Sequence, residues 1–168
     1  AGKTTLIRLL LRFYDPLEGD ISYNSVNIKN MDLHVYRDKF STVFQNPQIF
    51  AVRLKENIQM EQCEDSKNEQ RIFECIKKVN IPIHREDLDK NVTKEYDPEG
   101  LEFSGGERQK VAIARAVYSD KEIILMDEAS AALDPISESE INDILLKELK
   151  DKTLVIVTHR LTTVRHVD

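Results

Sequence analysis

The sequence contains no tryptophan, only two cysteines, and no apolar run long enough to cross a bilayer. Cys63 and Cys75 have no histidine or further cysteine beside them, which argues against a zinc site, and no signal peptide precedes them, which argues against a disulfide. The longest apolar runs, residues 123–126 and 154–157, have the length of strands, whereas a membrane helix needs about 20 residues. We therefore expect a cytosolic domain, with any membrane span in a flank.

Positive charge is also scarce, since 24 lysines and arginines stand against 30 aspartates and glutamates, for a net charge of −6. An acidic chain repels the phosphate backbone of nucleic acids, so non-specific binding to DNA or RNA is disfavoured. A local basic site for one small anion remains compatible with that total. With 168 residues, of which 40% are hydrophobic and 32% charged, the composition indicates one globular domain with room for a subdomain.

The two ends of the sequence indicate a piece of a longer protein. It opens on AGKTT without an initiator methionine and stops at VD without a capping or tail pattern. No internal repeat or low-complexity linker divides it. We therefore expect further segments on both sides.

Hydrophobic periodicity predicts an alternation of helices and strands. Apolar residues at helical spacing favour helices over residues 4–13, 66–79, 104–117 and 141–149. Apolar runs favour strands at residues 21–23, 26–28, 42–44, 122–126 and 153–157. Continuous apolar strands alternating with amphipathic helices are typical of an α/β fold, in which helices cover both faces of a mainly parallel sheet.

Polar residues follow three of these strands directly, namely Gln45, the pair Asp127 and Glu128, and His159 after Thr158. In parallel α/β folds, ligands bind beyond the carboxyl ends of the strands. This coincidence is the main functional signal in the sequence.

The first residues, Gly2, Lys3, Thr4 and Thr5, match the second half of a phosphate-binding P-loop, G-x-x-x-x-G-K-[ST]. In that motif, N–H groups at a helix N-terminus hold phosphate oxygens, the lysine reaches the β- and γ-phosphates, and the hydroxyl equivalent to Thr4 ligates Mg²⁺. The alternative is a plain helix start with a lysine in its first turn. On this stretch alone the two interpretations have equal weight.

The pair Asp127 and Glu128 fits the acidic end of a nucleotide-binding strand. Asp127 would support Mg²⁺ through a water molecule, and Glu128 would orient and deprotonate the attacking water. An acidic turn after a core strand is the alternative, and for the pair in isolation it is the more common explanation. The position beside the P-loop favours catalysis, because a general base acts only within hydrogen-bond reach of its water.

His159 and Gln45 carry weaker signals. His159 could donate to the γ-phosphate, and Gln45 could contact Mg²⁺ or the attacking water. A single histidine is more often a surface or capping residue, and a single loop glutamine usually has no function. Neither residue would count without the others.

The stretch from Ser104 to Glu107 opens a well-patterned helix with two glycines, although glycine costs about 1 kcal/mol relative to alanine inside a helix. A capping box explains Ser104 and Glu107 but not Gly105 and Gly106. Glycines let a ligand approach the backbone, and a helix N-terminus attracts anions, so we expect a second phosphate site here. If this corner lies far from the P-loop, one nucleotide cannot contact both in the same chain. Each chain would then offer the corner to a nucleotide held by a partner.

Six motifs, in this order, resemble those of the ATP-binding cassette (ABC) ATPase family over essentially the whole chain. They are the P-loop end AGKTT, the Q-loop FQNPQIF with Gln45, the signature FSGGERQ, the Walker B strand IILMDE, the D-loop SAALD ending at Asp134, and the switch histidine His159 in THR. The signature is the most specific of the six. Within the family, YDPLEGDI, NPQIFAVRLKENI and ASAALDP resemble exporters, and EYDPEGLEFSGGE resembles bacterial members.

The resemblance implies a P-loop NTPase fold with an inserted ABC helical subdomain. The core would comprise about residues 1–45 and 119–168, and the helical subdomain about residues 46–118. It also implies an ATPase that uses ATP and Mg²⁺. The residues implied to bind the nucleotide are Gly2, Lys3, Thr4, Thr5, Ser104, Gly105, Gly106, Glu107 and Asp134. Those implied to serve the metal are Thr4, Gln45 and Asp127, and those implied in catalysis are Glu128, His159 and Gln45.

The resemblance further implies protein partners and no nucleic acid. Two cassettes, identical or different, would close head to tail over two Mg-ATP, with Ser104 and Gly106 facing the partner's γ-phosphate. Residues 45–58 would contact transmembrane domains at the cytoplasmic face of the cell membrane, and Ile49 and Phe50 would either join that contact or belong to the core. Without the first P-loop glycines, residues 1–168 alone are expected to bind ATP poorly and to be inactive.

The sequence departs from the family pattern at the signature, where Glu107 replaces the commoner glutamine and Phe103 replaces leucine. Residues 96–100 also differ from the acidic loop of many exporters. One alternative function is a soluble ABC ATPase acting on ribosomes or DNA. The coiled-coil chromosome types are disfavoured, because only about 100 residues without sustained heptads separate the P-loop from the signature. A catalytically silent module is the other alternative, and the intact Glu128 and His159 argue against it. The transported solute is not disclosed by the sequence.

Overall fold

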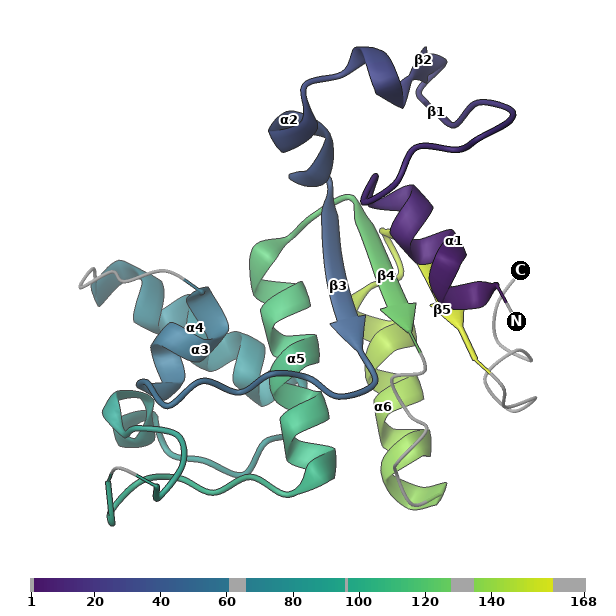
Figure 1. Ribbon diagram of the computed structural model, residues 1–168. Coiled ribbons are helices and arrows are strands. Elements are labelled where there is room, and N and C mark those ends of the chain that lie inside the picture. The colour runs from purple at the N-terminus through teal and green to yellow at the C-terminus, as the bar shows by residue number, and fades with distance from the viewer. Residues whose placement is uncertain (1, 61–65, 96, 128–134, 159–168) are drawn as a thin grey trace.

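A three-stranded parallel sheet lies at the centre of the computed structural model, which describes residues 2–60, 66–95, 97–127 and 135–158 (Figure 1). The register aligns Phe44 with Asp127, and Asp127 with Val157, so the carboxyl ends of the strands meet at one edge of the sheet. The strands, in spatial order, are β3 (Phe40–Phe44), β4 (Ile123–Asp127) and β5 (Thr153–Val157).

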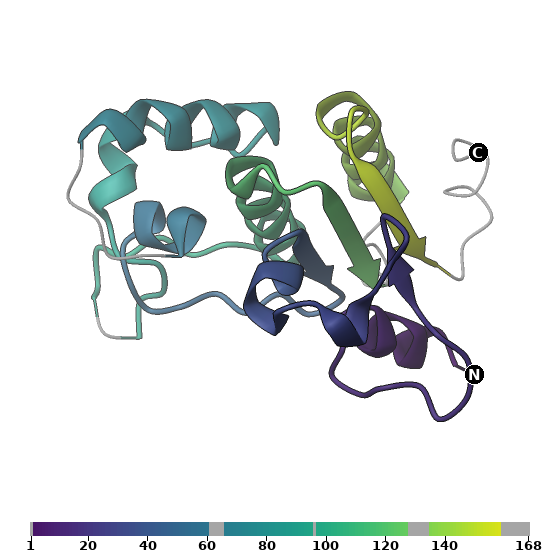
Figure 2. The ribbon, with the colours of Figure 1, turned by 90° about the horizontal axis from the view of Figure 1, so that it is seen from above.

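Helices cover both faces of this sheet (Figure 2). The central strand explains why, because Ile124 and Met126 join one buried cluster, whereas Leu125 joins another with Ile7. Successive side chains of a strand point to opposite faces, so an all-apolar strand needs a layer of helix on each side. The covering helices are α1 (Lys3–Leu10) on one face, and α5 (Gly105–Ser119) and α6 (Pro135–Glu148) on the other. This arrangement confirms the predicted α/β fold.

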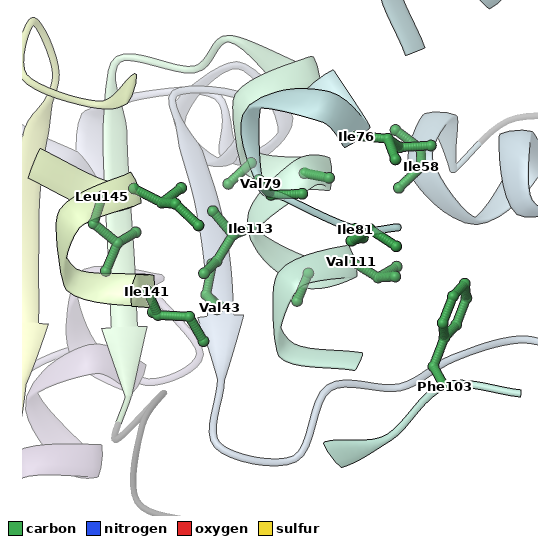
Figure 3. Packing of buried hydrophobic residues seen from close by; sticks show 14 of the residues in the cluster. Val43, Ile58, Ile76, Val79, Ile81, Phe103, Val111, Ile113, Ile141 and Leu145 are labelled. Carbon is green, nitrogen blue, oxygen red and sulfur yellow. The ribbon is translucent and has the colours of Figure 1, made fainter. Parts of the chain in front are cut away.

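Helix α5 also packs against the insertion, the helices that precede it in the chain between β3 and β4. Figure 3 shows Ile113 on the side of α5 that faces Val43 and Ile141, and Val111 on the side that faces Ile81. All five belong to one buried cluster, so a single core spans the sheet and the insertion. The insertion contains α3 (Leu54–Gln59), α4 (Ser66–Lys78) and the 3₁₀ segment η2 (Arg85–Asp89). Its expected bounds as a subdomain, residues 46–118, stay a prediction.

A buried cation joins the inserted helices to one another. Lys55 of α3 is only 8% exposed, and its Nζ lies 2.6 Å from Asp89 Oδ1 and 3.1 Å from Glu69 Oε1. The hydrogen bonds to Asp89 and Glu69 raise the pKa of Lys55, so the amine stays charged at neutral pH. Because removal of either carboxylate would leave that charge less well compensated, the three groups specify how α3, α4 and η2 pack.

The chain between α1 and β3 forms a small hairpin that is attached to the sheet. Its two turn residues, Asn24 and Ser25, have φ angles of 48° and 66°, as a type I′ turn requires. The hydroxyl of Tyr23 donates to the carboxylate of Glu122, the residue before β4. The segment contains β1 (Ser22–Tyr23) and β2 (Val26–Asn27), which pair antiparallel, followed by the 3₁₀ segment η1 (Ile28–Asn30) and α2 (Leu33–Arg37).

Two predicted elements have different ends in the structure, each for a local reason. The helix expected over residues 4–13 ends at Leu10, since Arg12 adopts a left-handed φ of 52° and its guanidinium donates to the carbonyl of Ile28. The strand expected over residues 26–28 ends at Asn27, whose side-chain oxygen accepts from the N–H of Lys29 and begins η1.

Periodicity predicts neither α2 nor α3, because helices of five and six residues are too short to repeat an apolar position more than once. The helix predicted over residues 141–149 begins six residues earlier, at Pro135. The remaining predicted helices and strands are confirmed within about two residues. None of the helices that the structure describes is long and apolar enough to cross a membrane. Cys75 is a buried free thiol, and Cys63 lies outside the described residues.

Replacement of Ile113 by alanine tests the shared core. Ile113 is 0% exposed, so Ile113→Ala is expected to lower the free energy of unfolding by about 2–5 kcal/mol through lost burial and a residual cavity. The matched control is Ile136→Ala in α6, where the side chain is 74% exposed and a change within about 0.5 kcal/mol is expected. Urea unfolding measures both, and equal effects would contradict the packing described here.

Candidate functional site

Two of the predicted site residues, Gln45 and Asp127, lie at the carboxyl edge of the sheet. Asp127 is the last residue of β4, and Gln45 directly follows β3, its side chain exposed. Glu128, Asp134 and His159 lie outside the described residues. The register of the three strands brings their carboxyl ends to the same edge, as the sequence predicts.

The first turn of α1 meets this edge. Gly2 caps the helix with a φ of 98°, a left-handed conformation that glycine adopts without strain. The hydroxyl of Thr4 donates to Asp127 Oδ2 over 3.3 Å, and Lys3 Nζ donates to the carbonyl of Thr158 over 3.0 Å. Thr4 and Asp127 are 123 residues apart in the chain, so this contact exists only because the fold brings α1 to the end of β4.

These groups fit a divalent cation and an anion. A hydroxyl and a carboxylate are oxygen ligands of the kind that Mg²⁺ prefers, and both side chains are accessible at the edge of the sheet. The first turn of α1 contains no acidic residue. Its N–H groups and Lys3 therefore offer positive charge to a phosphate without an opposing carboxylate on the helix. Thr5 lies exposed in the same turn.

The predicted capping box at the start of α5 is confirmed. The N–H and the hydroxyl of Ser104 both donate to Glu107 Oε2 over 2.8 Å, and the N–H of Glu107 donates to Ser104 Oγ over 3.3 Å. The box satisfies donors that a helix N-terminus otherwise leaves unpaired. Glu107 thus keeps the reciprocal bond that a glutamine would make at this position.

The glycine that follows the cap has no packing reason to be glycine. A Cβ added to Gly105 would meet nothing within 4 Å among the described residues. At Gly100, in contrast, an added Cβ would lie 2.4 Å from the carbonyl oxygen of Thr93, so that glycine is required by the close backbone. The open space at Gly105 is what a ligand that approaches the helix N-terminus needs.

The structure does not bring Ser104 and Lys3 to one site. Helix α1 and helix α5 belong to the layers on opposite faces of the sheet, and Figure 1 shows the first turn of α5 well away from the N-terminus of α1. The two candidate phosphate sites are therefore separate within one chain.

The loop after β3 is fastened to α5 by two polar side chains that are not among the predicted site residues. Gln109, 2% exposed, donates from Nε2 to the carbonyl of Phe44 over 3.3 Å. Arg115 donates from Nη1 to the carbonyl of Gln48 over 2.6 Å. Burial lowers the pKa of Arg115 to about 10. A signal for both residues exists in the sequence, because they fall on the apolar face that Ala112 and Val111 mark at helical spacing.

A groove of about 690 Å³ opens beside this loop, lined by β3, the loop, α3, α4 and α5. Three of its large apolar side chains are 45% to 55% exposed: Phe44, Phe50 and Met60. Its polar lining includes Arg71 and Arg115. An exposed apolar lining with cationic groups is typical of a surface that receives another protein segment.

Comparison with known proteins identifies the family of the chain. The model of the ABC transporter family matches residues 1–131. Among curated proteins, ABC transporter B family member 14 of Arabidopsis thaliana is 36% identical over 168 residues, which is 100% of this chain and 13% of that protein. Multidrug resistance protein 4 of Entamoeba histolytica is 34% identical over 99% of this chain and 13% of its own length.

Solved structures give the same result. A bacterial Atm1-family ABC exporter with ATP bound superposes with a TM-score of 0.79 and is 32% identical, over 98% of this chain and 29% of that one. The chain thus spans a small part of the proteins that it matches.

Replacement of Ser104 by alanine tests the capping box. Ser104→Ala is expected to lower the free energy of unfolding by about 1 kcal/mol, because the N–H of Glu107 loses its acceptor. Ser119→Ala is the matched control at the other end of α5, where the hydroxyl bonds only to the carbonyl of Ala116 and a change within about 0.5 kcal/mol is expected. Urea unfolding with hydrogen exchange at the first turn of α5 measures both variants. An equal loss in the two would argue against the cap.

Proposed function

This chain belongs to the ABC transporter family, and we propose that it is the domain that binds and hydrolyses ATP to drive a membrane exporter. The observation that carries the proposal is the contact between the Thr4 hydroxyl and Asp127, with Lys3 in the same helical turn. It joins the P-loop to the Walker B strand, the two motifs on which ATP chemistry in such a fold depends.

Binding is assigned to the edge where α1 meets β4 and β5. The N–H groups at the start of α1, together with Lys3 and Thr5, hold the phosphates of ATP, and Thr4, Asp127 and Gln45 hold Mg²⁺ directly or through water. The bound Mg²⁺ would neutralise charge on the phosphates. The open position of Gln45 after β3 supports its place at the metal or the attacking water, since the register puts it beside the end of β4.

Hydrolysis is assigned to Glu128, with His159 as its neighbour at the γ-phosphate. The Glu128 carboxylate accepts a proton from the attacking water, the water oxygen bonds to the γ-phosphorus, and the bond from that phosphorus to the bridging oxygen of ADP breaks. ADP and phosphate leave. Glu128 follows Asp127 directly in the sequence, which supports its reach to a water beside the metal.

The nucleotide is also assigned a second set of contacts, from a partner cassette. The corner formed by Ser104, Gly105 and Gly106 presents a helix N-terminus and open space, but α5 and α1 lie on opposite faces of the sheet. An identical or related cassette docked head to tail would bring its own corner, together with Asp134, to the nucleotide on this chain. Each cassette would then supply half of two pockets.

The groove lined by Phe44, Phe50 and Met60 is the proposed docking surface for transmembrane domains. It lies beside the loop that carries Gln45, which supports a route from the membrane part to the nucleotide. Phe50 is exposed in the groove, whereas Ile49 packs against the core. Such docking would hold the domain at the cytoplasmic face of the cell membrane.

A soluble ABC ATPase acting on ribosomes or DNA is not favoured. The curated relatives reported above are named as ABC transporters and as a multidrug resistance protein, and a net charge of −6 gives no attraction to a nucleic acid backbone.

Replacement of Glu128 by glutamine in the full-length protein tests the general base. Glu128→Gln is expected to bind Mg-ATP normally and to lose turnover by about 10²–10⁴-fold, because the amide cannot accept the proton of water. Glu122→Gln, at the opposite end of β4, is the control; its carboxylate bonds to Lys39 and lies away from the nucleotide edge. Phosphate release and ATP binding are measured on both. Turnover at the wild-type rate in Glu128→Gln would remove Glu128 from this role.

A mixing experiment tests the composite pockets. In assemblies where one cassette carries Lys3→Ala and the other Gly106→Asp, one pocket keeps both of its halves, so activity above that of either single variant is expected. The control combines Lys3→Ala with Glu128→Gln, two residues that each chain contributes to the same pocket. Both pockets are then impaired, and no recovery is expected. Recovery in the control, or equal activity in the two mixtures, would contradict a pocket shared between cassettes.

A further inference from the structure

One buried asparagine organises the loop that follows Gln45. Asn57 is 0% exposed, and its Oδ1 accepts the N–H of Phe50 over 2.9 Å while its Nδ2 donates to the Phe50 carbonyl over 2.9 Å. The same Nδ2 also lies within hydrogen-bond distance of the carbonyls of Val52 and Arg53. The Asn57 amide thus pairs with the loop backbone as a neighbouring strand would.

The guanidinium of Arg115 connects this loop to α5. Its Nε donates to the Asn57 carbonyl over 2.6 Å, its Nη2 to Asn57 Oδ1 over 2.9 Å, and its Nη1 to the Gln48 carbonyl over 2.6 Å. The Phe50 ring lies 5.6 Å from the guanidinium carbon. The planar guanidinium therefore contacts Gln48 in the loop and Asn57 in α3 at the same time. The single amine of lysine cannot reproduce this geometry.

Arg115, which is half-buried in α5, differs from Lys55, the buried cation of α3. Lys55 is paired with two carboxylates, whereas no carboxylate among the described residues forms an ion pair with Arg115. Its pKa of about 10 still leaves it charged at neutral pH. A half-buried cation compensated mainly by carbonyl oxygens and a ring adds little to the stability of a fold. We therefore look for a role that depends on where those carbonyls are held.

The ties to α5 lie on both sides of Gln45. Gln109 holds the carbonyl of Phe44, the residue before Gln45, and Arg115 holds the carbonyl of Gln48, three residues after it. Both side chains come from the helix whose first turn carries Ser104. A displacement of α5 must therefore move the backbone around Gln45, and a partner in the adjoining groove acts on the same guanidinium, because Arg115 and Phe50 both line it.

We propose that Arg115 is a positioning residue for Gln45. Arg115 fastens the loop after β3 to α5, so that the groove, Gln45 and the signature corner (Ser104, Gly105 and Gly106) move together. The inference rests on the proposed ATPase function. Arg115 contacts neither nucleotide nor metal, and its effect on turnover passes through the position of the loop. A merely stabilising arginine would change how much protein is folded, but not the turnover of each folded site.

The test is Arg115→Lys in the full-length protein, with Arg37→Lys as the matched control. Arg37 also donates to two backbone carbonyls, those of Leu11 and Arg12, and also stacks on a phenylalanine, with its guanidinium carbon 5.1 Å from the Phe13 ring. It is the last residue of α2 and contacts the chain just after α1, away from the loop after β3. The two variants thus remove the same kind of contact in two places.

Two measurements separate positioning from stability. The first is kcat and KM for Mg-ATP, with kcat divided by the number of sites that bind Mg-ATP. The second is hydrogen exchange of the backbone amides in residues 44–60, compared with those in β4 and β5. For Arg115→Lys we expect kcat per site to fall on the order of tenfold with KM nearly unchanged, because a small misplacement of a catalytic group is costly. Exchange should rise in residues 44–60 alone.

Arg37→Lys should lower the melting temperature and leave kcat per site and loop exchange at wild-type values. Unchanged kcat per site and unchanged loop exchange in Arg115→Lys would overturn the inference, and so would equal losses of kcat per site in the two variants. If Arg115→Lys fails to fold, Gln109→Met releases the other tie, and the same loss of kcat per site is expected of it. A wild-type protein without ATPase activity would refute the proposed function. Hydrogen exchange in residues 44–60 would still show whether Arg115 holds the loop.

Discussion

The arrangement of the whole chain depends on the burial of β4 on both faces. Its apolar side chains alternate between the cluster under α5 and α6 and the cluster under α1. A strand buried in this way can present polar groups only at its ends, and Asp127 is the residue at its carboxyl end. The requirement that fills the core therefore also fixes where the acidic edge can lie, and it holds α1 close enough for Thr4 to reach Asp127.

The same burial separates the two helix N-termini that suit a phosphate. Because α1 and α5 must cover different faces, one chain cannot fold them over a single triphosphate. Helix α5 is in turn shared between the sheet and the inserted helices, since Ile113 and Val111 pack on its two sides (Figure 3). Two polar side chains of this helix, Gln109 and Arg115, bond to the loop after β3. They link that loop to the helix that also begins at the signature corner.

Local patterns predict the parts of this fold that repeat along the chain. The continuous apolar runs at β4 and β5 and the periodic face of α5 suffice to give the layers, and the capping box at Ser104 and Glu107 is local enough to be found within four residues. The contact between Thr4 and Asp127 is predicted only as a shared edge, not as a bond. Periodicity does not predict the hydrogen bonds of Asn57 and Arg115, because most of their partners are backbone groups, which no residue type encodes.

The glycine at position 105 shows where packing within one chain ceases to explain the sequence. Gly2 has a left-handed φ, and at Gly100 a Cβ would clash with a backbone carbonyl. The fold therefore explains both glycines. Gly105 has helical neighbours and free space, where alanine would fit and would favour the helix. The packing of the described residues therefore does not account for this glycine. An anion bound at this helix N-terminus, as proposed above, would account for it, because it requires close approach to the backbone and nothing from the side chain.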